Sequence, residues 1–364
     1  MKKSVWVVLL LGIFWIMSNS IPVVDAQAGP TVTELLRSGN NGAKQNLVII
    51  GDGFQQDTAP GVGDQTNYNN IVDAFVMQGV FSDGVLAEIM NSFNIYRVNV
   101  NSVNTGVTQI TQNIIANNNA TGGVITSDID GDGIPAALNT ALGYEYSGDW
   151  NRCWMERGPN TAAAETNLLN ALVPQWDFVF VILNQPTGGG CRRGNFMAVT
   201  TGSAWTTVAH EMGHMVGNLG DEYVLAPAVN YATSGLGEPP NQNLTTNTTR
   251  NTIKWGNFID PNTPIPTACA GLDATQDAGV FTGGTRGSTS YNAGLFRPHC
   301  NDRMTSNVPA FGTVNYNLLR QATDPFHEYT FDNSYVGDFD GDGWDDLVLH
   351  NANSLALYVS TGSE

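Results

Sequence analysis

Apolar residues along the chain form short runs that predict strands. Leu47–Ile50 is apolar throughout and is followed by Gly-Asp-Gly, which predicts a buried strand and then a turn. Phe93–Val100 alternates as a second strand, and Asp177–Leu183 is apolar enough after its first residue to lie at the centre of a sheet. Thr66–Met90 has apolar residues at helical spacing. The more polar Asn195–Thr200 is expected to be an edge strand.

An edge strand at this position would allow an extended peptide to pair with it through backbone hydrogen bonds. The alternative is that the glycine-rich segment Gly188–Gly190 covers the edge as a loop. After Tyr223 the chain is rich in Asn, Thr, Pro and Gly as far as about Asn251, and a loop is expected there.

The first 28 residues have the features of a secretory signal. Met1, Lys2 and Lys3 give a positive start, Val5–Met17 is apolar, and Ala26-Gln27-Ala28 is a small-residue exit. The apolar run is shorter than the roughly 20 residues of a spanning helix. We expect a leader over 1–28 and an extracellular protein, with an uncleaved anchor as the alternative. No later segment is predicted to cross a bilayer.

Composition limits the partners. The formal net charge is −18 and the sequence pI is about 4.4, so nucleic acid and anionic lipid would be repelled. The chain has four cysteines and none are spaced as C-x-x-C, which in an exported protein favours two disulfides over a metal cluster. We favour Cys153 with Cys191 and Cys269 with Cys300; free buried thiols are the alternative.

Residues 210–214 read His-Glu-Met-Gly-His, the H-E-x-x-H pattern of zinc hydrolases. On a helix His210 and His214 lie one turn apart on one face, where two imidazoles can bind one metal ion. Glu211 is not needed as a ligand and is expected to act as the base that deprotonates water. The alternative is a chance match within an ordinary amphipathic helix.

The residues behind the second histidine offer a third ligand. Gly217 is expected to end the helix and turn the chain, so that Asp221 returns beneath the metal, with Glu222 as the competing ligand. Tyr223 is a candidate helper at the developing oxyanion or a core residue. His299 and His327 are more simply read as surface or packing residues.

Two acidic loops place carboxylates at alternate positions with glycines between them, as calcium sites do. The first is weak, because Pro135 interrupts it and Asn139 stands where an EF-hand has Glu. The second continues into two candidate strands, Leu347–Leu349 and Leu355–Tyr358. The candidate calcium ligands are Asp128, Asp130 and Asp132 in the first loop and Asp338, Asp340, Asp342 and Asp346 in the second.

The chain resembles the IgA-peptidase-like zinc metallopeptidases, a metzincin-like group whose sites read H-E-x-G-H followed by L-x-D-E-Y. The matching residues here are His210, Glu211, Gly213, His214, Leu219, Asp221, Glu222 and Tyr223. Other short sequence motifs that resemble those of the family occur between about residues 45 and 325, including W…TPxPT at 255–267 and (Y/F)RP…C…M at 296–304. The best-known metzincins have a histidine where this chain has Gly220. The resemblance implies Met304 in a turn beneath the zinc.

Residues 335–362 resemble one FG-GAP or VCBS repeat, a calcium-loop blade of β-propellers. We therefore expect a leader at 1–28, an α+β metzincin-like peptidase domain at 29–330 with a twisted mixed sheet, an active-site helix and a loop-rich C-terminal subdomain, and a truncated repeat at 331–364. The predicted function is that of a secreted zinc endopeptidase acting on protein or peptide, with Zn²⁺ and possible Ca²⁺ sites. The alternative is a non-catalytic secreted adhesion protein or a calcium-dependent surface-binding protein.

Overall fold

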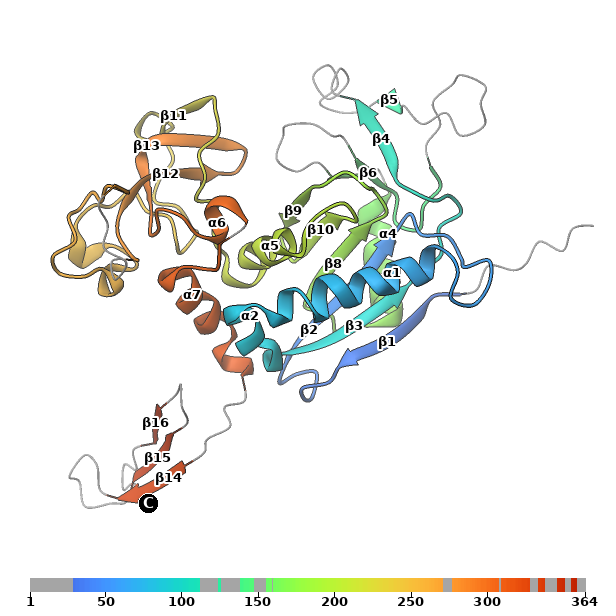
Figure 1. Cartoon of the computed structure of the whole chain (residues 1–364), viewed down its shortest axis with the longest axis horizontal. Helices are drawn as coiled ribbons and strands as arrows, with labels where there is room; N and C mark the ends of the chain where they lie inside the picture. The colour runs from blue at the N-terminus through green and yellow to red at the C-terminus, as the bar shows by residue number, and fades with distance from the viewer. Residues whose placement is uncertain are drawn as a thin grey trace, which may run out of the picture.

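The computed structural model describes residues 29–111, 124–125, 138–146, 155–158, 160–270, 277–307, 309–327, 333–337, 346–350 and 355–358 (Figure 1). The predicted leader and both acidic loops lie outside these residues, apart from Asp346. No helix among the described residues is long and apolar enough to cross a membrane.

A six-stranded mixed sheet forms the framework of the N-terminal half. The four inner strands are parallel, and the two outer strands run antiparallel to their neighbours. In spatial order they are β1 (Thr31–Leu36), β3 (Phe93–Asn99), β2 (Gln45–Asp52), β8 (Phe178–Leu183), β10 (Phe196–Thr200) and β9 (Gly190–Arg193).

The inner strands are buried on both faces, which explains their continuous apolar runs. Leu47, Val48 and Ile49 are 0% exposed. One face packs against helices that precede and follow the parallel strands, and the other packs against α4 (Thr161–Leu172). The first face is covered by α1 (Asp64–Val72), the π-helical η1 (Asp73–Met77), the 3₁₀ turn η2 (Val80–Ser82), α2 (Gly84–Glu88) and α5 (Trp205–Gly217).

A second, smaller sheet lies on the same face of the framework as α4 and shares its core through Tyr144, Tyr146 and Met155. Its four strands are β5 (Val124–Ile125), β4 (Thr108–Thr111), β6 (Tyr144–Tyr146) and β7 (Met155–Arg157).

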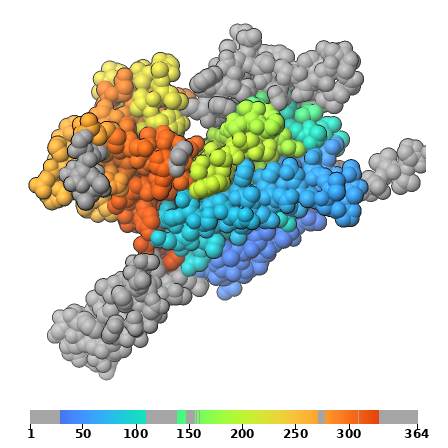
Figure 2. All heavy atoms as spheres, in the orientation of Figure 1, coloured from blue at the N-terminus to red at the C-terminus, as the bar shows by residue number. Residues whose placement is uncertain are grey.

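The part of the chain from about residue 220 to residue 327 has few regular elements, and we call it the C-terminal part. A three-stranded sheet in the order β11–β13–β12 packs with short helices around small cores of its own. Figure 2 shows the yellow-green atoms of the α5 region between this orange and yellow part and the blue framework. The elements are β11 (Ala228–Asn230), β12 (Phe281–Arg286), β13 (Thr289–Arg297), α6 (Arg303–Ser306) and α7 (Thr313–Thr323), with 3₁₀ turns η3 (Met90–Ser92), η4 (Tyr231–Thr233), η5 (Arg250–Thr252), η6 (Gly256–Phe258) and η7 (Asp324–Phe326).

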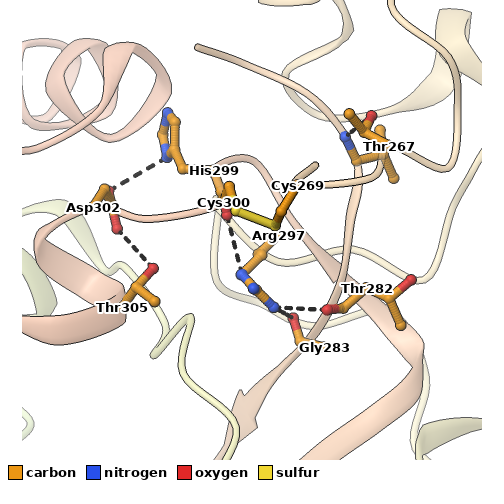
Figure 3. The surroundings of a disulfide bond; sticks show 10 residues. Thr267, Cys269, Thr282, Gly283, Arg297, His299, Cys300, Asp302 and Thr305 are labelled. Atoms are coloured by element: carbon orange, nitrogen blue, oxygen red, sulfur yellow. Dashed lines mark hydrogen bonds and ion pairs between the residues drawn. A yellow bond between two sulfur atoms is a disulfide. The ribbon is translucent and has the colours of Figure 1, made fainter. Parts of the chain in front are cut away.

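One disulfide lies in this part, between Cys269 and Cys300, which is the pair favoured from the sequence (Figure 3). Cys191 is also disulfide-bonded. Its expected partner, Cys153, lies outside the described residues. The end of the chain forms a separate antiparallel sheet of β14 (Asn333–Gly337), β15 (Asp346–His350) and β16 (Leu355–Tyr358), of which β15 and β16 were expected.

Three local predictions are wrong. Thr66–Met90 is not one helix, because the chain breaks near Gly79, whose missing side chain leaves room for Trp205. Asn195–Thr200 contains β10 but is not an edge, because β9 pairs with its outer side. The helix ends at Gly217, as expected, but Asn218 makes the turn, with a φ of 49°.

Candidate metal centre

Helix α5 carries three of the predicted site residues. It begins at Trp205 after an extended Ala204 and packs its apolar face into the core between the sheet and α7. His210 and His214 lie one turn apart on this helix, as the H-E-x-x-H spacing requires. The apolar residues that hold the helix in place are Val208, Ala209, Met212, Met215 and Val216.

The turn after α5 brings Asp221 back to the two histidines. The N–H of Leu219 donates to the Gly213 carbonyl at 3.2 Å, which closes the helix end around the left-handed Asn218. Asp221 is then held from its backbone, because its carbonyl accepts from Thr285 N at 2.9 Å. The sequence therefore predicted the return of the chain, although through a different turn residue.

Three potential ligand atoms form a nearly equilateral triangle. Asp221 Oδ1 lies 3.1 Å from His210 Nε2 and 3.1 Å from His214 Nε2, and the two Nε2 atoms lie 3.1 Å apart. Zinc bonds of about 2.0–2.1 Å in a tetrahedron place neighbouring ligand atoms about 3.3 Å apart. The triangle has the size that one such ion needs.

Hydrogen bonds on the far side of each ring fix the tautomers. His210 Nδ1 donates to the Arg303 carbonyl at 2.9 Å, and His214 Nδ1 donates to the Leu219 carbonyl at 2.6 Å. A carbonyl can only accept, so both Nδ1 atoms carry a proton, and the Nε2 atom that faces Asp221 has a lone pair whenever its ring is neutral. Three acceptors at 3.1 Å repel one another unless protons or a cation lie between them.

Electrostatics at the triangle agree with this geometry. Burial lowers the pKa of His214, but Asp221 and Glu211 outweigh burial and raise the pKa to about 9. Burial raises the pKa of Asp221, and the two histidines outweigh it and hold that pKa well below its usual range. The site thus stabilises positive charge at its centre.

Glu211 lies beside the triangle with a free carboxylate oxygen. The side chain is 5% exposed, and its Oε2 is buried without a hydrogen-bond partner. Burial raises the pKa of Glu211, with smaller opposing effects from the histidines. A buried carboxylate without a donor suits a group that receives a proton during a reaction.

The triangle and Glu211 open into a cavity of about 380 Å³ between the framework and the C-terminal part. Tyr223 lines this cavity, and its ring stacks near that of His210 with centroids 6.4 Å apart. The structure thus brings Tyr223 to the site rather than to the core. The other lining residues are Gly190, Cys191, Arg192, Leu219, Gly220, Asn241, Thr285, Gly287 and Ser288.

Met304 lies beneath α5. It is 0% exposed, and a Cβ added to Gly213 would meet its Sδ at 2.8 Å. Gly213 therefore allows Met304 to approach the helix between its two histidines. The neighbouring Arg303 carbonyl is the acceptor for His210 Nδ1, so this segment supports the candidate ligand from below.

Glu222, the competing ligand, points away from the triangle. It is 0% exposed, and its Oε1 accepts from Asn243 at 2.8 Å and Asn315 at 2.6 Å. Its N–H donates to the Met304 carbonyl at 2.9 Å. Glu222 thus joins the turn that carries Asp221 to the segment beneath α5.

His299 belongs to this second buried cluster rather than to the surface. Its Nδ1 lies 3.3 Å from Asp302 Oδ2 (Figure 3). The same atom lies 3.7 Å from Glu222 Oε2. These three residues could bind a metal by distance alone. The Val314 N–H donates to His299 Nε2 at 3.2 Å, however, so the ring proton is on Nδ1, which then cannot be a ligand. We interpret the cluster as a hydrogen-bonded support.

The remaining candidates lie elsewhere. His327 is half-buried, with Nδ1 3.3 Å from Ser92 Oγ, and is not part of the site. Asp346 begins β15, where its backbone pairs with Gly337. The possible calcium ligands Asp128, Asp130, Asp132, Asp338, Asp340 and Asp342 lie outside the described residues.

The comparison with protein families gives one match. A family model described as IgA Peptidase M64 matches residues 121–281, which include α5 and Asp221. Over these residues the chain is similar to that family, which supports a metallopeptidase, and the triangle is a group that could hold its metal ion. No curated protein matches the chain.

Proposed function

We propose that this protein is an exported zinc endopeptidase that hydrolyses peptide bonds at the cavity beside α5. The observation that supports it best is the triangle of His210 Nε2, His214 Nε2 and Asp221 Oδ1, in which three acceptors lie 3.1 Å from one another. Two histidines and one carboxylate also suit Fe(II). The free carboxylate of Glu211 and the metallopeptidase family match favour zinc.

His210, His214 and Asp221 would hold the zinc ion, which would supply a water of lowered pKa, toward about 7, and a positive charge to polarise a peptide carbonyl. Glu211 accepts the proton of the attacking water through Oε2 and passes it to the leaving nitrogen as the C–N bond breaks. Tyr223 donates a hydrogen bond to the carbonyl oxygen as negative charge develops on it. His210 and His214 keep their orientation through the Arg303 and Leu219 carbonyls.

The substrate backbone pairs with β9. This strand is the outer strand of the sheet, and the described residues provide no strand on its other side. Gly190 in β9 lies against Glu211, since an added Cβ would meet Glu211 Oε1 at 2.9 Å. A peptide that extends β9 therefore passes the proposed base, with its chain continuing in both directions, as an endopeptidase requires.

Removing the metal tests this proposal. The zinc-loaded full chain is expected to cleave casein into peptides with new internal ends. A chelator is expected to abolish cleavage, because without the metal neither the attacking water nor the peptide carbonyl is activated. Added zinc is expected to restore it. Mass spectrometry of the products provides the measurement. Unchanged cleavage after the metal content has fallen to zero would contradict the proposal, as would a zinc-loaded protein that cleaves no protein substrate.

A further inference from the structure

Alternation along β9 determines which of its side chains face the proposed active site. Gly190 pairs with Val199 and Arg192 pairs with Met197, and both partners belong to the core on the α5 side. Cys191 packs against the core on the opposite face. Because side chains alternate along a strand, Gly190 and Arg192 face α5, whereas Cys191 and Arg193 face away.

Arg192 is thus one strand period away from the point where β9 passes Glu211. Two residues of a strand span about 7 Å, and a peptide paired with β9 repeats at the same spacing. Arg192 lines the same cavity as Glu211. Its guanidinium therefore faces a substrate residue close to the scissile bond but not the bond itself.

No described carboxylate forms an ion pair with the guanidinium of Arg192. Its Nε donates to the Gly194 carbonyl at 2.5 Å, and the described residues give its two terminal nitrogens no hydrogen bond or ion pair. Burial lowers the pKa of Arg192, and the nearby Glu211 partly opposes this. Among the described residues, those that line the cavity after Tyr223 in the sequence are all neutral: Asn241, Thr285, Gly287 and Ser288.

We propose that Arg192 forms a subsite for a carboxylate of the substrate, next to the bond that is cleaved. The inference rests on the proposed peptidase function and names the class of peptide that the site prefers. A planar guanidinium whose terminal nitrogens have no partner among the described residues can bind a carboxylate through paired hydrogen bonds. That carboxylate belongs either to an Asp or Glu side chain or to the C-terminus of the peptide. Arg192 binds the ground state and the transition state alike, so its effect falls on KM.

The test uses the zinc-loaded full chain and a casein-derived peptide that it cleaves. Each position within three residues of the scissile bond is replaced in turn by Asp, Asn or Lys, and the C-terminus is either free or amidated. We expect Asp to exceed Asn in kcat/KM by roughly tenfold at one position, mainly through KM. A kcat/KM that is the same for Asp and Asn at every position but falls when the C-terminus is amidated assigns the carboxylate to the C-terminus.

Variants of Arg192 and Arg193 distinguish a specific subsite at Arg192 from a general attraction between positive charge on β9 and an acidic substrate. Arg192→Met is expected to bring the Asp-to-Asn ratio close to one, and Arg192→Glu to favour Lys at the same position. Arg193→Met, on the other face of β9, is expected to keep the wild-type ratio. Equal kcat/KM for Asp, Asn and amidated peptides in the wild type, or the same ratio in Arg192→Met and Arg193→Met, would overturn the subsite and leave the peptidase proposal intact. Failure of the wild type to cleave any peptide, neutral ones included, would reject the peptidase proposal instead.

Discussion

Glu211→Gln is expected to lower kcat for peptide hydrolysis by roughly 10²- to 10⁴-fold, the usual contribution of a positioned general base. The amide keeps the size of the side chain but cannot accept a proton from water. Because Glu211 contributes no ligand atom to the triangle, the variant is expected to bind one zinc ion per chain, as the wild type does. Steady-state kinetics on one peptide and metal analysis of the same sample measure both effects.

Glu34→Gln is the matched control. Glu34 is a solvent-accessible carboxylate on β1, paired with Arg37 at 2.7 Å, at the opposite edge of the sheet from β9. Its loss is expected to leave kcat unchanged. A Glu211→Gln protein that binds zinc and turns over at the wild-type rate would show that another group, or none, acts as the base.

Asp221→Ala is expected to weaken zinc binding by more than about 100-fold. Loss of a group that merely orients a ligand typically costs 10- to 100-fold in affinity, and loss of a ligand should cost more. The side chain of Asp221 contacts both histidines through Oδ1. Competition with a chelator of known zinc affinity gives the constant, and cleavage should fall with the metal content.

Glu222→Gln distinguishes a ligand from its neighbour. Gln can still accept from Asn243 and Asn315, so the turn should keep its shape and zinc should stay bound. The variant should have a lower melting temperature than the wild type, because Glu222 is fully buried and the substitution changes its hydrogen bonds. Retained zinc in Asp221→Ala together with lost zinc in Glu222→Gln would exchange the two assignments.

The sequence predicts best the parts of the fold whose physical cause is local. The central strands are apolar on both faces because both faces are buried, so Leu47–Ile50 and Phe178–Leu183 could be recognised from the runs themselves. The H-E-x-x-H spacing also acts locally: it places His210 and His214 on one face of the helix, because one helical turn separates them.

Other features depend on contacts between distant segments. Strand β9 begins with Gly190, which has a low strand propensity, and its two arginines give it no apolar run; it forms because β10 offers it an open edge. Arg192 belongs to no motif, and only the register of β9 places it in the cavity. The support around Glu222 draws on residues 243, 299, 302 and 315, whose spacing has no period that could be read from the sequence.

The position of zinc in a crystal of the wild-type protein tests the central claim most directly. Anomalous scattering at the zinc edge is predicted to give one peak about 2.1 Å from each of His210 Nε2, His214 Nε2 and Asp221 Oδ1. A peak among Glu222, His299 and Asp302, or no zinc peak in a crystal grown with the metal, would contradict the three-ligand site and the hydrolase that depends on it.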